Sequence, residues 1–336
     1  GSWGIAGNQE IPNNAYETLV SESGGVVNIV RYGNPDIKWE TTATLNFGLD
    51  YGFFNNRLRG STDLYYKKSK DILTNLPFNP TTGWGYLNYN TGTLEGHGVD
   101  LNIAGTIINA AFKWNSSFNF AYNTNEVTDS RFTNYANILN GSGSTAPIVG
   151  YPTNSIFAFR NAGLNNSGYV QVYDRNGTIV QSNVMLTDMA DMKYMGSSVP
   201  KYYGSLSANL TYKKLSLYLL ATYKLDYVMF KPTFANYVSR GLFNQYDLNA
   251  EIDQRWRNPG DEATTNVPGV QGMGGYSYSR YVYGENRIID GDHIRFRELS
   301  LKYDGLEEEK YIVNLLIGKL LENFKINLDF SMRLKA

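Results

Sequence analysis

The stretch TLNFGLDYGF, residues 44–53, alternates strictly between two kinds of side chain. Its odd-numbered residues are apolar or aromatic, and its even-numbered residues are Thr, Asn, Gly and Asp. Successive side chains of a β-strand point to opposite faces, so this pattern predicts a strand with one apolar and one polar face. Its length matches the ~9–11 residues that a tilted crossing of a bilayer needs. Strands of soluble proteins are usually shorter, at ~5–6 residues.

The same design recurs along the chain. Alternating segments cover residues 58–67, 99–107, 112–123, 202–212, 215–225, 294–303 and 324–335. Short turns at 55–57, 109–111 and 213–214 join neighbouring segments into three hairpins. Near Glu298 the alternation slips by one place, which predicts a β-bulge. Asp, Lys, Arg and Asn stand in mid-strand on the polar faces, which suits a hydrated lumen and would be costly in a packed sandwich core.

The connections between hairpins are of two kinds. Very short turns alternate with the long segments 74–96, 124–200 and 227–292, which are rich in Gly, Asn, Tyr and Pro. Structureless loops of that length argue against a compact soluble domain. Short turns at one end and long loops at the other are typical of the periplasmic and extracellular ends of an outer-membrane barrel. The sequence therefore predicts an all-β fold, an antiparallel transmembrane β-barrel with long extracellular loops.

Composition excludes several other classes of protein. The chain has 30 Lys and Arg against 31 Asp and Glu, so it lacks the basic field of a nucleic-acid-binding protein. It has no cysteine, which excludes disulfides, thiolate metal sites and cysteine nucleophiles. No apolar run approaches ~18 residues, so we expect no transmembrane helix. The N-terminus shows neither the basic nor the apolar segment of a signal peptide, and we expect an internal piece of a longer precursor.

Several motifs resemble one family of transporters. They are SWGIAGNQE (2–10), NPDIKWE (34–40), GLDYGFFNNRL (48–58), YYKKSKDIL (65–73), GYP (150–152) with Gly168 and DRNG (174–177), RWRNPGD (255–261) and DGDHIRFR (290–297). In this order they resemble the SusC/RagA-type branch of TonB-dependent outer-membrane transporters. The similarity runs from residue 1 to about residue 304. The tail 305–336 departs from the family pattern, and its apolar run 311–321 is compatible with a short helix.

The resemblance implies a fold and a function. It places residues 1–336 in the C-terminal part of a plugged barrel of about 22 strands, of which this chain supplies about 8–10. The plug domain, its TonB box and the signal peptide are expected to lie outside this chain. The implied activity is import of oligosaccharides or peptides, without cofactors or enzymatic chemistry. The implied partners are a SusD-like surface lipoprotein, outer-membrane lipids, and TonB, ExbB and ExbD acting through the absent N-terminal region.

Aromatic residues in the long loops are the candidate ligand-binding residues. They are Trp84, Tyr86 and Tyr89 in one loop, and Tyr276, Tyr278, Arg280 and Tyr281 in another. Aromatic faces beside polar side chains can stack on sugar rings and hydrogen-bond their hydroxyls. The alternative is that these side chains pack the loops together or form the interfacial aromatic belt.

Other conspicuous residues predict structure rather than chemistry. The two histidines, His97 and His293, each stand beside a strand, and we expect neither a metal site nor a catalytic residue. The DRNG segment lacks the later Glu of a calcium loop, so it predicts a hairpin turn. Residues 34–36 and 256–261 are likewise expected to shape turns. An outer-membrane barrel enzyme and a soluble secreted glycan-binding β-protein remain as alternative functions.

Overall fold

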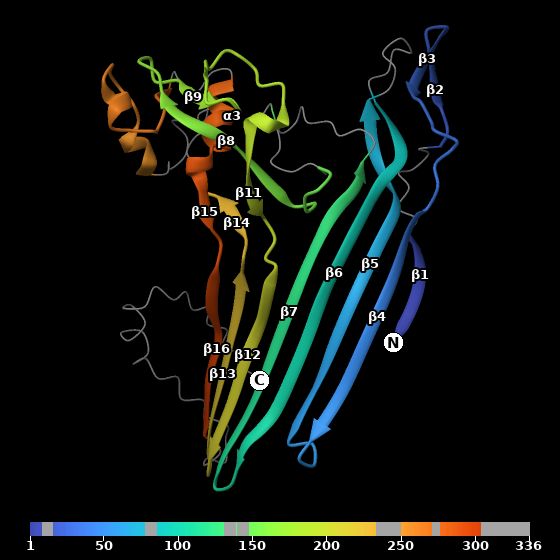
Figure 1. Cartoon of the computed structure of the whole chain (residues 1–336), viewed down its shortest axis with the longest axis vertical. Helices are drawn as coiled ribbons and strands as arrows, with labels where there is room; N and C mark the ends of the chain where they lie inside the picture. The colour runs from blue at the N-terminus through green and yellow to red at the C-terminus, as the bar shows by residue number, and fades with distance from the viewer. Residues whose placement is uncertain are drawn as a thin grey trace.

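The computed structural model describes residues 1–8, 16–77, 86–130, 139, 148–232, 250–270 and 276–303. Eight strands form one antiparallel sheet in the order β1-β4-β5-β6-β7-β12-β13-β16. Their bounds are β1 (Ser2–Asn8), β4 (Glu40–Phe53), β5 (Leu58–Pro77), β6 (Tyr86–Asn109), β7 (Phe112–Ser130), β12 (Tyr202–Tyr212), β13 (Leu215–Leu225) and β16 (His293–Tyr303). Strands that follow one another along this sheet are hydrogen-bonded neighbours (Figure 1), which confirms the all-β antiparallel barrel wall. The predicted segment 324–335 and the tail 305–336 lie outside the described residues.

The three tight turns gather at one end of the sheet (Figure 1), as predicted. In the turn between β4 and β5, Asn55 and Asn56 adopt φ values of 56° and 62°. Asparagine enters this left-handed region more readily than most residues, which explains its place in the turn. The predicted bulge in β16 is also confirmed. Leu220 pairs with Glu298 and Ala221 pairs with Phe296, which leaves one extra residue on β16 between them.

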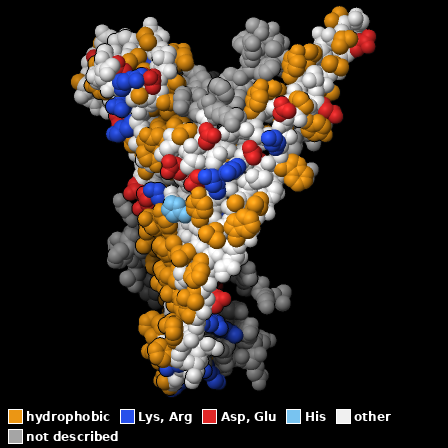
Figure 2. Space-filling model, turned by 45° about the vertical axis from the view of Figure 1, so that its right-hand side comes forward, with side chains coloured by type: hydrophobic (Ala, Val, Ile, Leu, Met, Phe, Trp, Pro, Cys, Tyr) orange, Lys and Arg blue, Asp and Glu red, His pale blue; other side chains and the backbone are white. Residues whose placement is uncertain are grey.

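One face of the sheet exposes an apolar band. Leu45, Phe47 and Leu49 on β4 have exposed fractions of 55%, 58% and 55%. The same band includes Phe53, Leu64, Ile107, Phe112, Leu206, Tyr212 and Leu215 on neighbouring strands. Figure 2 shows apolar side chains over the lower part of the molecule, with charged side chains gathered above them. Such a surface is costly in water and suits contact with lipid chains.

Aromatic rings mark the upper border of this band. The ring centroids of His97 and Tyr122 are 6.1 Å apart, and those of Tyr122 and Tyr202 are 5.1 Å apart. Immediately beyond them, Lys68 Nζ lies 2.6 Å from Glu95 Oε1, and the Tyr66 hydroxyl donates to Glu95 Oε2 at 2.7 Å. From Leu58 to Tyr66 the band extends about 26 Å along β5, which at a strand tilt of 35–45° corresponds to about 20 Å along the membrane normal.

The strands are longer than predicted. β5, β6 and β7 contain 20, 24 and 19 residues, and their pairing continues as far as Pro77 with Tyr86. The prediction of a loop across 74–96 is therefore wrong at both of its ends. Above the aromatic border both faces of the strands carry polar residues, so the apolar alternation stops although the backbone pairing continues. The extra length extends the wall beyond the bilayer.

The other long segments fold into a small unit at the extracellular end, here called the cap (residues 148–200 and 250–292). Strands β8 (Ser155–Leu164), β9 (Val170–Tyr173), β10 (Ile179–Val180) and β11 (Met192–Ser197) form a sheet in the order β10-β9-β8-β11. The cap also contains the helix α3 (Tyr276–Val282), the 3-10 helices η2 (Met189–Asp191), η3 (Ala250–Gln254), η4 (Asp261–Ala263) and η6 (Glu285–Arg287), and the strand β15 (Ile288–Asp290). These segments are therefore not structureless loops.

Two short ribbons complete the fold. β14 (Val228–Phe230) pairs with β15 and connects the cap to the wall strands β13 and β16. A hairpin of β2 (Leu19–Ser23) and β3 (Val26–Arg31) projects at the opposite side of the extracellular end (Figure 1). Within the described ranges, no helix has both the length and the apolar character needed to cross a membrane.

The two faces of β4 give a direct test of the lipid-facing assignment. In the full-length transporter folded into lipid vesicles, Leu49→Arg should lower the free energy of unfolding by about 2–4 kcal/mol, because it places a charge in hydrocarbon. Asp50→Arg, on the opposite face, is the matched control and should change this free energy by about 0.5 kcal/mol or less. Equal effects of the two substitutions, measured by urea unfolding, would contradict the assignment.

Candidate substrate-facing surface

The face opposite the apolar band, here called the inner face, carries ordered rows of polar side chains. Asn102 pairs with Asn119, and Asn119 pairs in turn with Ser205. Asn119 Nδ2 donates to Ser205 Oγ at 2.9 Å, and in the next row the hydroxyls of Ser117 and Ser207 are 2.6 Å apart. These bonds satisfy polar groups at the depth where the opposite face is apolar, so the two faces of the sheet differ sharply in polarity.

Besides a hollow of about 370 Å³ near the tight turns, lined by Arg59, Asn115 and Ser207 among others, two further hollows lie along this face. The first has a volume of about 300 Å³ and is lined by Ser61, Asp63, Asp100, Asn102, Asn119 and Tyr203, among others. The second, of about 420 Å³, lies where the sheet meets the cap and is lined by Asn125, Asn154, Tyr203 and Lys224, among others. Both are open, and both combine polar side chains with apolar surface in their lining.

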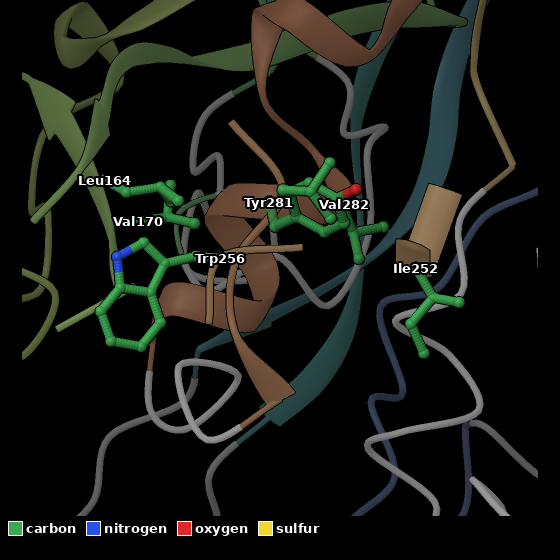
Figure 3. Packing of buried hydrophobic residues seen from close by; sticks show 7 residues of the cluster. Leu164, Val170, Ile252, Trp256, Tyr281 and Val282 are labelled. Carbon is green, nitrogen blue, oxygen red and sulfur yellow. The ribbon is translucent and has the colours of Figure 1, made fainter. Parts of the chain in front are cut away.

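Trp256 from the RWRNPGD motif anchors the core of the cap. Its side chain is buried beside Leu164, Val170, Tyr281 and Val282 (Figure 3). A Cβ atom at Gly168 would lie 2.6 Å from the Trp256 ring, and Gly168 has a φ of 75°, so only glycine fits there. The Trp256 indole also donates to Glu262 at 3.0 Å. The motif and the distant Gly168 therefore act together as a packing unit.

The remaining motif residues shape turns, as predicted. Asp174 Oδ1 accepts hydrogen bonds from the backbone N–H groups of Asn176 and Thr178, both at 2.8 Å, and closes the β9–β10 hairpin. Asp261 Oδ2 accepts from the backbone N–H groups of Asn258 and Arg257, and these bonds lower the pKa of the Asp261 carboxyl.

Asn34 likewise closes a turn, next to the barrel wall. Its Oδ1 accepts from the backbone N–H of Asp36 at 3.0 Å, and its Nδ2 donates to the carbonyl of Asn88 on β6 at 2.8 Å. The side chain is buried. The NPD turn is therefore tied to the extracellular extension of the sheet rather than presented to solvent.

The predicted ligand-binding aromatics fall into separate environments. Tyr86 and Tyr89 belong to strand β6 instead of a loop, because the β5–β6 pairing extends to them. Trp84 lies outside the described residues. Tyr276, Tyr278, Arg280 and Tyr281 belong to helix α3, where a loop was expected. The seven residues YSYSRYV carry too short a pattern to signal a helix, and the helix forms by packing against the cap.

Arg280 and Tyr281 are enclosed, with exposed fractions of 2% each. Arg280 Nη1 donates to the carbonyls of Val180 and Gln181 at 3.2 and 2.8 Å, and Nη2 donates to the carbonyl of Val184. Burial lowers the pKa of Arg280 to about 10, so the side chain remains charged at neutral pH. Arg280 therefore clamps the 180–184 segment onto α3. Tyr276 and Tyr278 remain partly exposed on the same helix.

Arg287 is a second buried arginine, which the sequence motifs did not reveal. Its guanidinium contacts the Glu251 carboxylate and lies 4.8 Å from the centroid of the Tyr281 ring. It also donates to the carbonyl of Pro232 at 3.0 Å. It thereby joins η3, α3 and the segment after β14. No local signal predicts this role, because Glu251 and Pro232 lie 36 and 55 positions away in the sequence.

The histidines carry no metal site in the described part of the chain. His97 faces outward at the aromatic border beside Tyr122. His293 Nδ1 lies 2.9 Å from the carbonyl of Gly291 and 3.1 Å from the hydroxyl of Tyr227, at the start of β16. Both residues have structural surroundings that account for them.

Comparison with known proteins identifies the family. The model for "TonB dependent receptor-like, beta-barrel" domains matches residues 6–267. The chain belongs to this family. TonB-dependent receptor P39 of Formosa agariphila is 27% identical over 380 residues, which cover 96% of this chain and 36% of that protein. TonB-dependent receptor SusC of Bacteroides thetaiotaomicron is 27% identical over 271 residues, covering 74% of this chain and 25% of SusC.

A solved structure agrees with this assignment. The RagAB peptide importer in its 'closed-closed' state matches with a TM-score of 0.67 and 26% identity, covering 90% of this chain and 33% of that chain. This TonB-dependent receptor barrel therefore spans about a third of the length of its relatives. The predicted resemblance to the SusC/RagA type is confirmed, and the barrel resides in the bacterial outer membrane.

The role of Arg280 gives a testable consequence. In the full-length receptor, Arg280→Met should destabilise the cap by more than about 2 kcal/mol, because three partly buried carbonyls lose the charged donor that bonds them. Limited proteolysis of the folded receptor should then cut within the cap while the barrel stays intact. Arg257→Met replaces an exposed arginine of the same unit and should leave the cleavage rate unchanged. A cap that resists protease equally in both variants would contradict the clamp.

Proposed function

We propose that the whole receptor containing this chain imports oligosaccharides or peptides across the outer membrane with energy supplied through TonB. Membership of the TonB-dependent receptor family over residues 6–267 carries the proposal. The apolar outer band and the polar inner face with its hollows support it, because they fit a wall between lipid and a hydrated passage. These observations favour import over a barrel enzyme or a soluble glycan-binding protein.

We further propose that a SusD-like surface lipoprotein delivers the substrate at the extracellular end. The related RagAB structure is that of a peptide importer. In this chain the cap and the extended strands β5–β7 offer a folded surface at that end (Figure 1). TonB, ExbB and ExbD act, in this proposal, through the N-terminal region that the longer relatives contain.

Ligand contact by aromatic residues is a separate part of the proposal. Tyr276 and Tyr278 on α3, and Tyr89 on β6, keep partly exposed rings near the extracellular end. Such rings can stack on sugar or peptide groups. Arg280 and Tyr281 serve ligand binding only indirectly, because they hold α3 in place.

Deletion of the TonB box from the full-length gene tests the import proposal. Uptake should fall to the level of cells that lack the gene, because the energised opening of the passage is lost. Uptake is measured with labelled oligosaccharide and peptide mixtures, in cells that carry equal amounts of receptor in the outer membrane. A solute that enters through porins serves as the control and should be unaffected. Unchanged uptake in the deletion strain would contradict the import proposal.

A further inference from the structure

The turn between β4 and β5 presents an aromatic ring at the end of the sheet where the tight turns gather (Figure 1). Phe54 is 78% exposed, the largest exposed fraction among the large apolar residues that the structure describes. Its φ of 56° lies in the left-handed region, which bulky residues enter rarely and at an energetic cost. A ring held in a strained conformation while it remains exposed is a candidate contact site.

A hollow of about 370 Å³ lies beside this ring. It is lined by Phe54, Arg57, Leu58, Gly105, Thr106 and Ile107. Leu58 pairs with Phe53 of the apolar band, and Ile107 belongs to that band, so the hollow continues the lipid-facing surface. Leu58 also pairs with Gly105, and Gly105 pairs in turn with Ser116. The hollow therefore lies between strands that have neighbours on both sides, and a plug inside the barrel would lie against the opposite face.

Arg57 brings a positive charge to the rim of this hollow. Its backbone N–H donates to the carbonyl of Phe54 at 3.2 Å and closes the turn. Its Nη2 donates to the carbonyls of Thr106 and Ile107 at 3.3 and 3.2 Å, which holds the guanidinium against the end of β6. Within the described ranges Arg57 forms no ion pair, and its Nε and Nη1 bond no protein acceptor. These planar N–H donors suit the oxygens of a phosphate group.

The other two tight turns repeat the combination of aromatic ring and cation. Lys213 Nζ lies 5.3 Å from the centroid of the Tyr212 ring, and Tyr212 is exposed in the apolar band. Phe112, which is also exposed, is followed directly by Lys113. The segments 53–58, 108–113 and 212–215 together contain four cations and no Asp or Glu. Because aromatic rings favour the headgroup level of a membrane and clustered cations attract anionic lipids, this end of the wall is complementary to an anionic leaflet.

We propose that the hollow beside Phe54 binds a phospholipid of net negative charge from the periplasmic leaflet of the outer membrane. The lipid phosphate bonds Arg57, an acyl chain lies against Leu58 and Ile107, and the Phe54 ring lies at the level of the headgroup. A zwitterionic lipid is less favoured, because the three turns offer no carboxylate to a headgroup ammonium. The site goes beyond import, since it fixes the depth of this end of the barrel whatever solute passes through.

Fluorescence quenching by brominated lipids tests the site. The purified full-length receptor carrying Phe54→Trp is reconstituted into phosphatidylcholine vesicles. These contain increasing amounts of brominated phosphatidylglycerol or brominated phosphatidylcholine in both leaflets. The signal of the unsubstituted receptor is subtracted, which leaves the emission of the introduced indole. Half-maximal quenching should need about two- to fivefold less phosphatidylglycerol than phosphatidylcholine, the range for one exposed charge pair.

Two further substitutions in the same hairpin separate the charges. When Arg57→Gln is added to Phe54→Trp, both lipids should quench equally. Arg59→Gln is the matched control and should keep the preference, because Arg59 lies two residues further along β5 and lines the hollow of the inner face. The proposal is overturned if Phe54→Trp alone shows no preference, if the preference survives Arg57→Gln, or if Arg59→Gln abolishes it as well.

Two controls distinguish lipid from other partners of Arg57. Inorganic phosphate, compared with sodium chloride at equal ionic strength, should leave the preference unchanged, and its loss would assign the site to free phosphate instead of lipid. In lipid-free detergent, Arg57→Gln should change the Tm of the full-length receptor no more than Arg59→Gln does. A larger drop would show that Arg57 bonds another part of the receptor and would overturn the lipid site. These measurements need neither TonB nor a transported solute, so their outcome is independent of the import test.

Discussion

Hydrocarbon offers no hydrogen-bond partners, so every backbone N–H and C=O within the membrane must pair inside the protein. This constraint explains the long unbroken ladder from β1 through β16 and the antiparallel pairing of all its neighbours. It also explains why side chains are free to differ so sharply between the faces. Because the ladder already pairs the backbone N–H and C=O groups, the side chains of the outer face can suit lipid while those of the inner face are polar.

The ladder also brings aromatic rings and glycines together. Tyr65 is paired directly with Gly98, and Tyr223 with Gly204. A Cβ atom at either glycine would lie 2.3 or 2.6 Å from the hydroxyl oxygen of its tyrosine. The missing side chain lets the ring lie across the neighbouring strand. This arrangement accounts for part of the abundance of the two residue types, with 27 Tyr and 33 Gly in the chain.

In the cap, unlike in the barrel wall, the apolar side chains are buried. It lies in water, so it needs a buried core, and most of the buried apolar side chains of the described residues belong to it. Its two buried arginines bond carbonyls and a carboxylate, which avoids the cost of an isolated buried cation. One chain thus combines a wall whose apolar residues face outward with a small unit whose apolar residues face inward. The β14–β15 ribbon joins them.

The sequence by itself determined the wall and its family. Alternation within 44–53, the polar turns and the slipped register near Glu298 are local signals, and local backbone geometry is enough to interpret them. Only the tertiary structure decided the rest. Above the membrane both strand faces are wet, so no alternation marks the extension of β5–β7. Arg280 and Arg287 bond residues up to 100 positions away.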